Sequence, residues 1–148
     1  MPGGIYHTGW RGVVRGPIFL DDEDRALFLR ELARTQRTHR WKVELYCLLT
    51  NHLHLLIETP LANLSAGMQR LGSGYARRFN ARHRRRGHVF EQRFWSSLIK
   101  SEAELEVVAA YIRQNPVSAG VCKDPADWPW LGGRLERPRS SQRTWAYV

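Results

Sequence analysis

Cysteine, acidic residues and long apolar runs are all scarce in this sequence of 148 residues. Its two cysteines, Cys47 and Cys122, stand apart without Cys-x-x-Cys spacing, which argues against a disulfide framework and favours a reducing cytoplasm. No apolar run approaches the roughly 18 residues of a membrane span. Residues 1–4 have neither the basic lead nor the apolar core of a signal peptide. We therefore expect a cytoplasmic protein with no membrane partner.

The small number of acidic residues leaves a strongly basic chain. Lysine and arginine number 23 against 14 aspartates and glutamates, which gives a formal net charge of +9 and a sequence pI of about 10.4. A polyanion is the partner that such a charge favours. The length suits one domain, and the 43% hydrophobic content is typical of a globular protein rather than a disordered one.

Hydrophobic periodicity predicts seven elements. Strands are expected over residues 5–14, 41–49, 52–58 and 88–100, and helices over 21–36, 61–82 and 101–115. In the second strand, one face is expected to carry Val43, Leu45, Cys47 and Leu49. This order predicts an α+β fold of the ferredoxin-like or RRM-like split βαβ type, with one central antiparallel sheet, helices mainly on one face and an added C-terminal helix. We expect one domain over 1–130 and a flexible basic tail over 131–148.

Two histidines, His52 and His54, begin the third predicted strand. Side chains two residues apart leave the same face of a strand, so both imidazoles project together while Leu53, Leu55 and Ile57 point into a core. Converging imidazoles can hold a divalent metal ion or bind a phosphate. The ordinary alternative is that one histidine is solvent-exposed at the sheet edge and the other is buried with its hydrogen bonds made inside the protein.

The last predicted helix carries two polar residues one turn apart, Tyr111 and Asn115. They lie on a flank beside the apolar stripe, and an i, i+4 pair can reach the same point in space. Each also has an ordinary interpretation, Tyr111 as an aromatic at the core margin and Asn115 as a helix-ending residue before Pro116. Tyr75 is a rival tyrosine, but it follows the apolar line of the second helix and is predicted to pack in the core.

Five motifs occur in order along the chain. They are Tyr6-His7-x-x-x-Arg11-Gly12, Phe19-x-Asp21-Asp22-x-Asp24, Asn51-His52-x-His54-Leu55-Leu56, Gly87-x-x-Phe90-x-x-Arg93-Phe94 and Tyr111-Ile112-x-x-Asn115-Pro116-Val117-x-Ala119-Gly120. In this order and spacing they resemble the REP-associated tyrosine transposases, a branch of the single-tyrosine HUH transposases. The resemblance covers roughly residues 5–130.

The resemblance implies a DNA transposase that cleaves and rejoins single-stranded DNA at hairpin-forming repeats. In the chemistry of that family, His52, His54 and Asn115 hold a divalent ion, Mg²⁺ or Mn²⁺. Tyr111, on the C-terminal helix, is the implied nucleophile, which attacks a phosphodiester to give a 5′-phosphotyrosine and a free 3′-hydroxyl. We expect a monomer or homodimer in a bacterial cytoplasm, associated with the nucleoid when bound to DNA.

Arginine rather than lysine dominates the second helix and the turn after it, which suits bidentate contacts with phosphate. The arginines predicted to bind DNA are Arg77, Arg78, Arg82, Arg84, Arg85, Arg86, Arg93 and Arg11. The ordinary interpretation of these arginines is that they form a solvent-exposed face of the protein without a binding role. Phe90, Phe94 and Trp95 follow, and those that are exposed could stack on unpaired bases. A second basic and aromatic group comprises Arg134, Arg137, Arg139, Arg143, Trp145 and Tyr147.

Two other functions stay open at this point. One is a catalytically inactive module, derived from the same family, that binds single-stranded nucleic acid. The other is a metal-dependent phosphodiesterase that uses water in place of Tyr111. The sequence names neither the DNA target nor the physiological metal. Nor does it say whether Tyr111 serves its own chain or a partner, or whether the protein mobilises an element or is a domesticated transposase.

Overall fold

The computed structural model describes residues 3–136. Its elements are β1 (Gly4–Arg11), η1 (Val13–Arg15), α1 (Asp22–His39), β2 (Lys42–Leu48), β3 (His52–Thr59), α2 (Leu64–His83), β4 (Trp95–Leu98), α3 (Glu102–Ser118), η2 (Pro125–Asp127) and β5 (Leu131–Gly132). Within the described residues, no helix is both long and apolar enough to cross a membrane.

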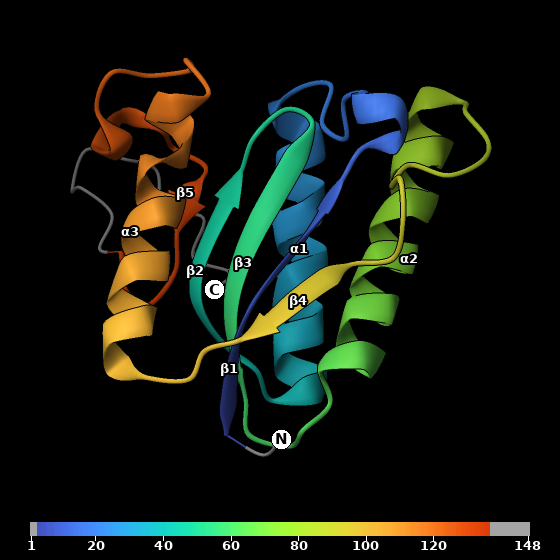
Figure 1. The fold of residues 1–148 in the computed structure, drawn as a ribbon. Coiled ribbons are helices and arrows are strands. Elements are labelled where there is room, and N and C mark those ends of the chain that lie inside the picture. The colour runs from blue at the N-terminus through green and yellow to red at the C-terminus, as the bar shows by residue number, and fades with distance from the viewer. Residues whose placement is uncertain (1–2, 137–148) are drawn as a thin grey trace.

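The strands form one antiparallel sheet in the order β4-β1-β3-β2-β5. Its first four strands have the order of a split βαβ fold, so the predicted fold class is confirmed. Figure 1 shows α1 and α2 side by side on one side of the sheet and α3 apart from them. The tail residues from 137 onward, with Arg137, Arg139, Arg143, Trp145 and Tyr147, lie outside the described part.

The sheet separates two apolar clusters because its strands alternate between faces. The side chains of Leu53, Leu55 and Ile57 are fully buried in the larger cluster, with residues of α1 and α2. On the other face, Leu45, Cys47 and Leu56 pack with Ala109 and Ile112 of α3 in a smaller cluster. α3 therefore covers the face to which β3 sends its histidines.

The second strand does not alternate throughout its length. A register shift between Val43 and Leu45 places Val43 opposite Ile57 and Leu45 opposite Leu56. Val43 therefore joins the larger cluster, while Leu45, Cys47 and Leu49 join the smaller one. The prediction of one shared face was wrong for Val43, because a bulge adds a residue to one strand and resets the alternation.

The strand predicted over residues 88–100 is much shorter, since β4 spans only Trp95–Leu98. The preceding residues instead cross the end of β1, where Phe90 forms an isolated bridge with Gly12. Val89 is buried, and Phe90 and Phe94 pack against the larger cluster. These aromatic contacts hold segment 87–94 away from the sheet edge as an irregular connection.

Two C-terminal boundaries also differ from those predicted. α3 continues through Pro116 to Ser118, so Asn115 does not end the helix. The helix then ends through backbone hydrogen bonds from Ala119 N–H to the carbonyl of Asn115. The sheet extends past residue 130, because Leu131 and Gly132 pair with Cys47 and Tyr46 of β2.

The packing of α2 on the sheet depends on a glycine. Gly67 is buried against the Trp41 ring, and a Cβ at this position would lie 2.1 Å from Trp41 Cζ2. Overpacking costs about 1–3 kcal/mol, and an overlap this close belongs at the upper end of that range. Alanine gains roughly 1 kcal/mol over glycine in a helix, which leaves a net loss of about 2 kcal/mol.

We therefore expect Gly67→Ala to lower the free energy of unfolding by about 2 kcal/mol, measured by urea denaturation. The matched control is Ser65→Ala, an exposed position in the same turn, which is expected to change stability by less than about 0.5 kcal/mol. Equal stability of the Gly67→Ala variant and the unmodified protein would show that α2 does not rest on Trp41 in this way.

Candidate active site

The histidine pair projects from β3 toward α3, as the alternation predicts. The His52 and His54 rings are 5.2 Å apart, and a third imidazole, from His7 of β1, lies 5.2 Å from that of His54. Trp95 of β4 closes this group, with its ring 4.7 Å from His7 and 5.6 Å from His54. Gly9 makes room for that ring, because a Cβ there would lie 2.8 Å from Trp95 Cζ2.

Both ring nitrogens of His52 face an amide oxygen. Its Nδ1 lies 2.8 Å from Asn51 Oδ1, and its Nε2 lies 3.1 Å from Asn115 Oδ1. A neutral imidazole donates through only one nitrogen, so when Nδ1 donates to Asn51, the lone pair of Nε2 faces Asn115. Two donor atoms for a metal ion, one imidazole nitrogen and one amide oxygen, therefore face the same point.

The second histidine is more deeply buried. Its Nδ1 lies 3.0 Å from His7 Nε2, while its Nε2 is buried and has no hydrogen-bond partner in the described part of the chain. A buried nitrogen without a partner is costly unless something satisfies it. When His54 Nδ1 donates to His7, the lone pair of His54 Nε2 remains for a ligand.

All three imidazoles are held neutral. The pKa of His54 is lowered to about 3, mainly by burial and further by the electrostatic cost of a second positive charge beside His52, His7 and Arg11. Burial also lowers the pKa of His7 and of His52, the latter despite the opposing effect of a hydrogen bond from His52 to Asn115 Oδ1. Neutral imidazoles keep the lone pairs that metal coordination requires.

The residues present fit a divalent ion through this mixed donor set. Within residues 3–136, no three His, Cys, Asp or Glu side chains gather as a metal site, so a third protein donor beside the two histidines would have to be the amide of Asn115. Ligand distances near 2.1 Å put two adjacent ligands of an octahedral ion about 3 Å apart, close to the spacing of His52 Nε2 and Asn115 Oδ1. His54 contributes its unpartnered Nε2.

The two residues singled out on α3 reach the histidines together. The Tyr111 ring lies 5.6 Å from that of His54 and 6.2 Å from that of His7, while its side chain stays 54% exposed. Asn115, one turn later, is buried against His52. Tyr111 thus lies beside the histidines of its own chain with its ring open to a large substrate.

The rival tyrosine has a structural role. Tyr75 is fully buried and its hydroxyl donates a hydrogen bond to the backbone carbonyl of Ile18. Burial raises the pKa of the Tyr75 hydroxyl well above its usual value, which disfavours the phenolate. The prediction that Tyr75 packs in the core is confirmed.

The predicted DNA-binding arginines fall into two groups. Arg82 is held by acidic residues at the start of α1, with Nη1 2.7 Å from Asp21 Oδ1 and from Asp24 Oδ1. The Arg82 guanidinium lowers the pKa of the Asp21 carboxyl to about 2. Arg78 pairs with the buried Glu31. These two arginines therefore support the contact between α1 and α2.

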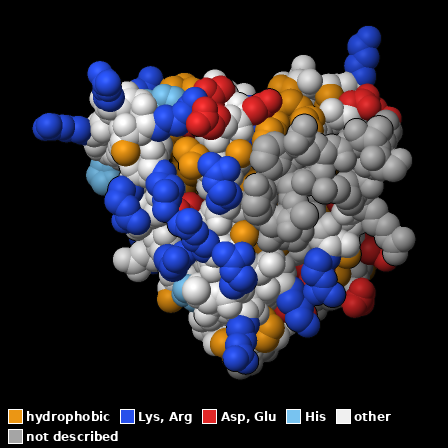
Figure 2. Space-filling model, turned by 180° about the vertical axis from the view of Figure 1, so that it is seen from behind, with side chains coloured by type: hydrophobic (Ala, Val, Ile, Leu, Met, Phe, Trp, Pro, Cys, Tyr) orange, Lys and Arg blue, Asp and Glu red, His pale blue; other side chains and the backbone are white. Residues whose placement is uncertain are grey.

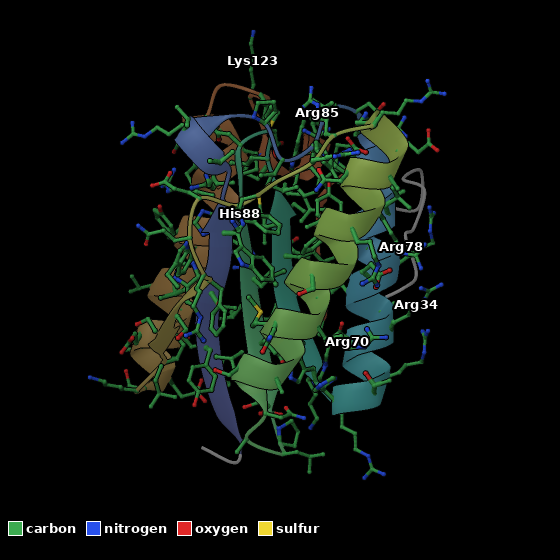
Figure 3. The ribbon with its side chains drawn as sticks, turned by 90° about the vertical axis from the view of Figure 1, so that its right-hand side faces the viewer. Arg34, Arg70, Arg78, Arg85, His88 and Lys123 are labelled. Atoms are coloured by element: carbon green, nitrogen blue, oxygen red, sulfur yellow. The ribbon has the colours of Figure 1, made fainter. Side chains whose placement is uncertain are left out.

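The other predicted arginines form no ion pair among the described residues; they are Arg11, Arg77, Arg84, Arg85, Arg86 and Arg93. All six are exposed. Arg11 lies closest to the histidines, since it pairs with His52 in the β1–β3 register. Figure 2 shows Lys and Arg side chains gathered on the rear face of the molecule. In Figure 3, Arg34, Arg70 and Arg78 project on the side formed by α1 and α2.

The sequence does not predict that three further residues lie beside His52 and His54. His7 belongs to a quoted motif, but only the pairing of β1 with β3 brings it to His54. Asn51 precedes the histidine pair, and its Oδ1 lies 2.8 Å from His52 Nδ1. For Trp95 the sequence suggests only stacking on unpaired bases. The adjacency of β1 and β3, which a split βαβ topology supplies, could have suggested that His7 meets His54.

Comparisons with known proteins identify the family of this chain. The family model described as "Transposase IS200 like" matches residues 3–115. A Haemophilus influenzae (strain ATCC 51907 / DSM 11121 / KW20 / Rd) protein, whose name places it among the REP-associated tyrosine transposases, is 30% identical over 95 residues. That match spans 57% of this chain and 54% of the relative's length, so the chain aligns with about half of that protein.

Two solved structures share the fold. One is the structure of a REP-associated tyrosine transposase bound to a REP hairpin, with a TM-score of 0.74 and 17% identity, covering 97% of this chain and 93% of that one. The other is from Deinococcus radiodurans R1 and is named as a transposase, with a TM-score of 0.53 and 16% identity, covering 77% and 92%. Since the family model matches most of its length, this chain belongs to the IS200-like transposases.

Proposed function

We propose that this protein cleaves and rejoins single-stranded DNA at hairpin-forming repeats through a covalent bond to Tyr111. The observation that carries the proposal is the contact of the exposed Tyr111 ring with His54, whose buried Nε2 has no partner in the described residues. A transposase bound to a hairpin repeat shares the fold, which supports hairpin DNA as the substrate class.

The reaction we propose is a phosphoryl transfer. The Tyr111 hydroxyl oxygen attacks the phosphorus of a DNA phosphodiester, loses its proton, and forms the tyrosine–phosphate bond as the bond to the 3′ oxygen breaks. That oxygen takes up a proton and leaves as a 3′-hydroxyl, while the 5′ side stays on the protein. Attack by a second 3′-hydroxyl reverses the step and joins strands, because the phosphotyrosine bond conserves the energy of the phosphodiester.

His52, His54 and Asn115 are the residues that would hold a divalent ion. When bound, such an ion polarises the phosphate and offsets the charge that develops on its oxygens. Because magnesium prefers oxygen ligands, two imidazoles in the set make Mn²⁺ the easier ion to accommodate. His7 is proposed as a positioning residue, since its Nε2 can accept the Nδ1 proton of His54, which leaves the Nε2 lone pair of His54 for a ligand.

We expect the unmodified protein to form a covalent protein–DNA adduct with hairpin oligonucleotides in Mn²⁺ or Mg²⁺, detected on a denaturing gel. The Tyr111→Phe variant should form none, a loss of at least about 10³-fold, because it removes the attacking oxygen. The matched control is Tyr46→Phe, since the Tyr46 side chain is buried in the larger apolar cluster on the opposite face of the sheet. DNA cleavage that continues in Tyr111→Phe without an adduct would instead indicate hydrolysis by water.

A second prediction concerns the metal alone. His7→Phe keeps a ring against Trp95 but removes the acceptor for His54, so Mn²⁺ affinity measured by titration calorimetry should fall about 10- to 100-fold. His7→Gln, which restores an acceptor at similar reach, should recover part of the loss. His88→Phe is the control, because His88 is exposed and outside the site. Unchanged Mn²⁺ affinity in His7→Phe would contradict a positioning role for His7.

A further inference from the structure

A groove of about 680 Å³ lies between α2 and the segment 87–94. It opens on the side of the sheet opposite the histidines, because its floor includes Trp10 and Met68 of the larger apolar cluster. The exposed polar residues along its margins include Gln69 and Ser73 of α2 and Gln92 of the connecting segment. The proposed cleavage chemistry uses none of these groups.

The groove offers aromatic surface. Phe90 is stacked on Trp10, with ring centroids 4.8 Å apart and an angle of 19° between the planes. Phe94 meets Trp10 edge-on at 6.4 Å. Trp10 is only 4% exposed, whereas Phe90 and Phe94 are partly exposed, so the two phenylalanines present their rings to a ligand. On the facing helix, Gly72 leaves the wall without a side chain.

The surroundings of the groove are mainly cationic, although the carboxylate of Glu91 is also part of its lining. The Arg93 guanidinium lies 5.9 Å from the Phe94 ring and lines the groove, as does His88. Figure 3 shows His88 on the segment beside α2 and Arg85 near the end of that helix. Arg84 and Arg86 follow α2 and have no ion-pair partner in the described part of the chain. A ligand with both an apolar ring and a negative charge suits this combination.

The groove and the candidate active site lie on opposite faces of the sheet at the same edge strand. Phe94 lines the groove, and its neighbour Trp95 lies on the other face, against His7 and His54. β4 is an edge strand, since it pairs only with β1 among the described strands. A single nucleic-acid strand that passes around β4 would therefore contact both places within a few nucleotides.

We propose that this groove binds an unpaired nucleotide of the DNA strand that is cleaved. Its base stacks on the exposed rings of Phe90 and Phe94, and its polar edge is read by the amides of Gln69 and Gln92, which can both donate and accept hydrogen bonds. Its phosphate is neutralised by Arg93. The groove thereby adds sequence preference next to the hairpin, and this inference rests on the proposed function.

The test uses a 12-nucleotide oligo(dT) probe with one central 2-aminopurine, whose fluorescence falls when the base stacks, and a blunt 12-base-pair duplex without unpaired bases. Phe94→Leu should weaken oligo(dT) binding about tenfold and relieve the quenching, because it removes a stacking ring. Duplex affinity should not change. Phe79→Leu is the matched control, since Phe79 is a buried core residue outside the groove and should leave both affinities unchanged.

An exposed residue provides a second variant that does not threaten folding. Gln69→Ala should reduce the differences in affinity among oligo(dT), oligo(dC) and oligo(dA) by several-fold. Full quenching and unchanged affinity in Phe94→Leu, or equal loss of duplex binding, would overturn the groove proposal. The proposed cleavage can fail independently of the groove proposal. In that case the protein forms no adduct at Tyr111, but it still quenches the 2-aminopurine probe, and Phe94→Leu still relieves that quenching.

Discussion

The pairing of β3 between β1 and β2 is the constraint on which the site depends. Leu53, Leu55 and Ile57 are completely buried against α1 and α2, and this burial fixes which way the strand faces. A slip of one residue would bury both histidines among apolar side chains and expose the leucines. Burial of each large apolar side chain is worth about 1.5–3 kcal/mol, so the free energy of the core determines where the imidazoles point.

The same pairing sets the chemistry of the imidazoles. β1 brings His7 alongside His54, and α3 lies over the face that they share. The resulting burial disfavours a positive charge, and the pKa of His54 falls to about 3. Neutral nitrogen donors beside an exposed tyrosine are a suitable arrangement for a reaction that passes through added negative charge on phosphate. The position of β3 in the sheet therefore determines both where the imidazoles point and why their pKa values are low.

Local pattern was enough to predict much of this arrangement. The i, i+2 spacing of His52 and His54 placed both on one face, and the i, i+4 spacing placed Tyr111 with Asn115, as the structure has them. These predictions held because strand and helix periods are set by the backbone. The order of elements likewise predicted the sheet, although it did not reveal the short strand β5.

What pattern did not predict depends on contacts between distant segments. A bulge in β2 places Val43 on the other face of the sheet from Leu45. β4 is short because Phe90 stacks on Trp10 instead of continuing the strand. In both places side-chain packing changes the alternation of faces that the sequence predicts. The ion pairs of Arg82 could not be predicted from local sequence, because its acidic partners lie at the start of α1; Asp21, for example, is 61 residues away in the sequence. His7 meets His54 only through the sheet.

The central claim is that Tyr111 forms the covalent bond to DNA. Peptide mapping of the denatured adduct by mass spectrometry tests it most directly, because trypsin releases residues 101–113 as a peptide whose single tyrosine is Tyr111. The account predicts the nucleotide mass on Tyr111 in that peptide. A nucleotide on Tyr75, in the tryptic peptide 71–77, or on any other residue would contradict it.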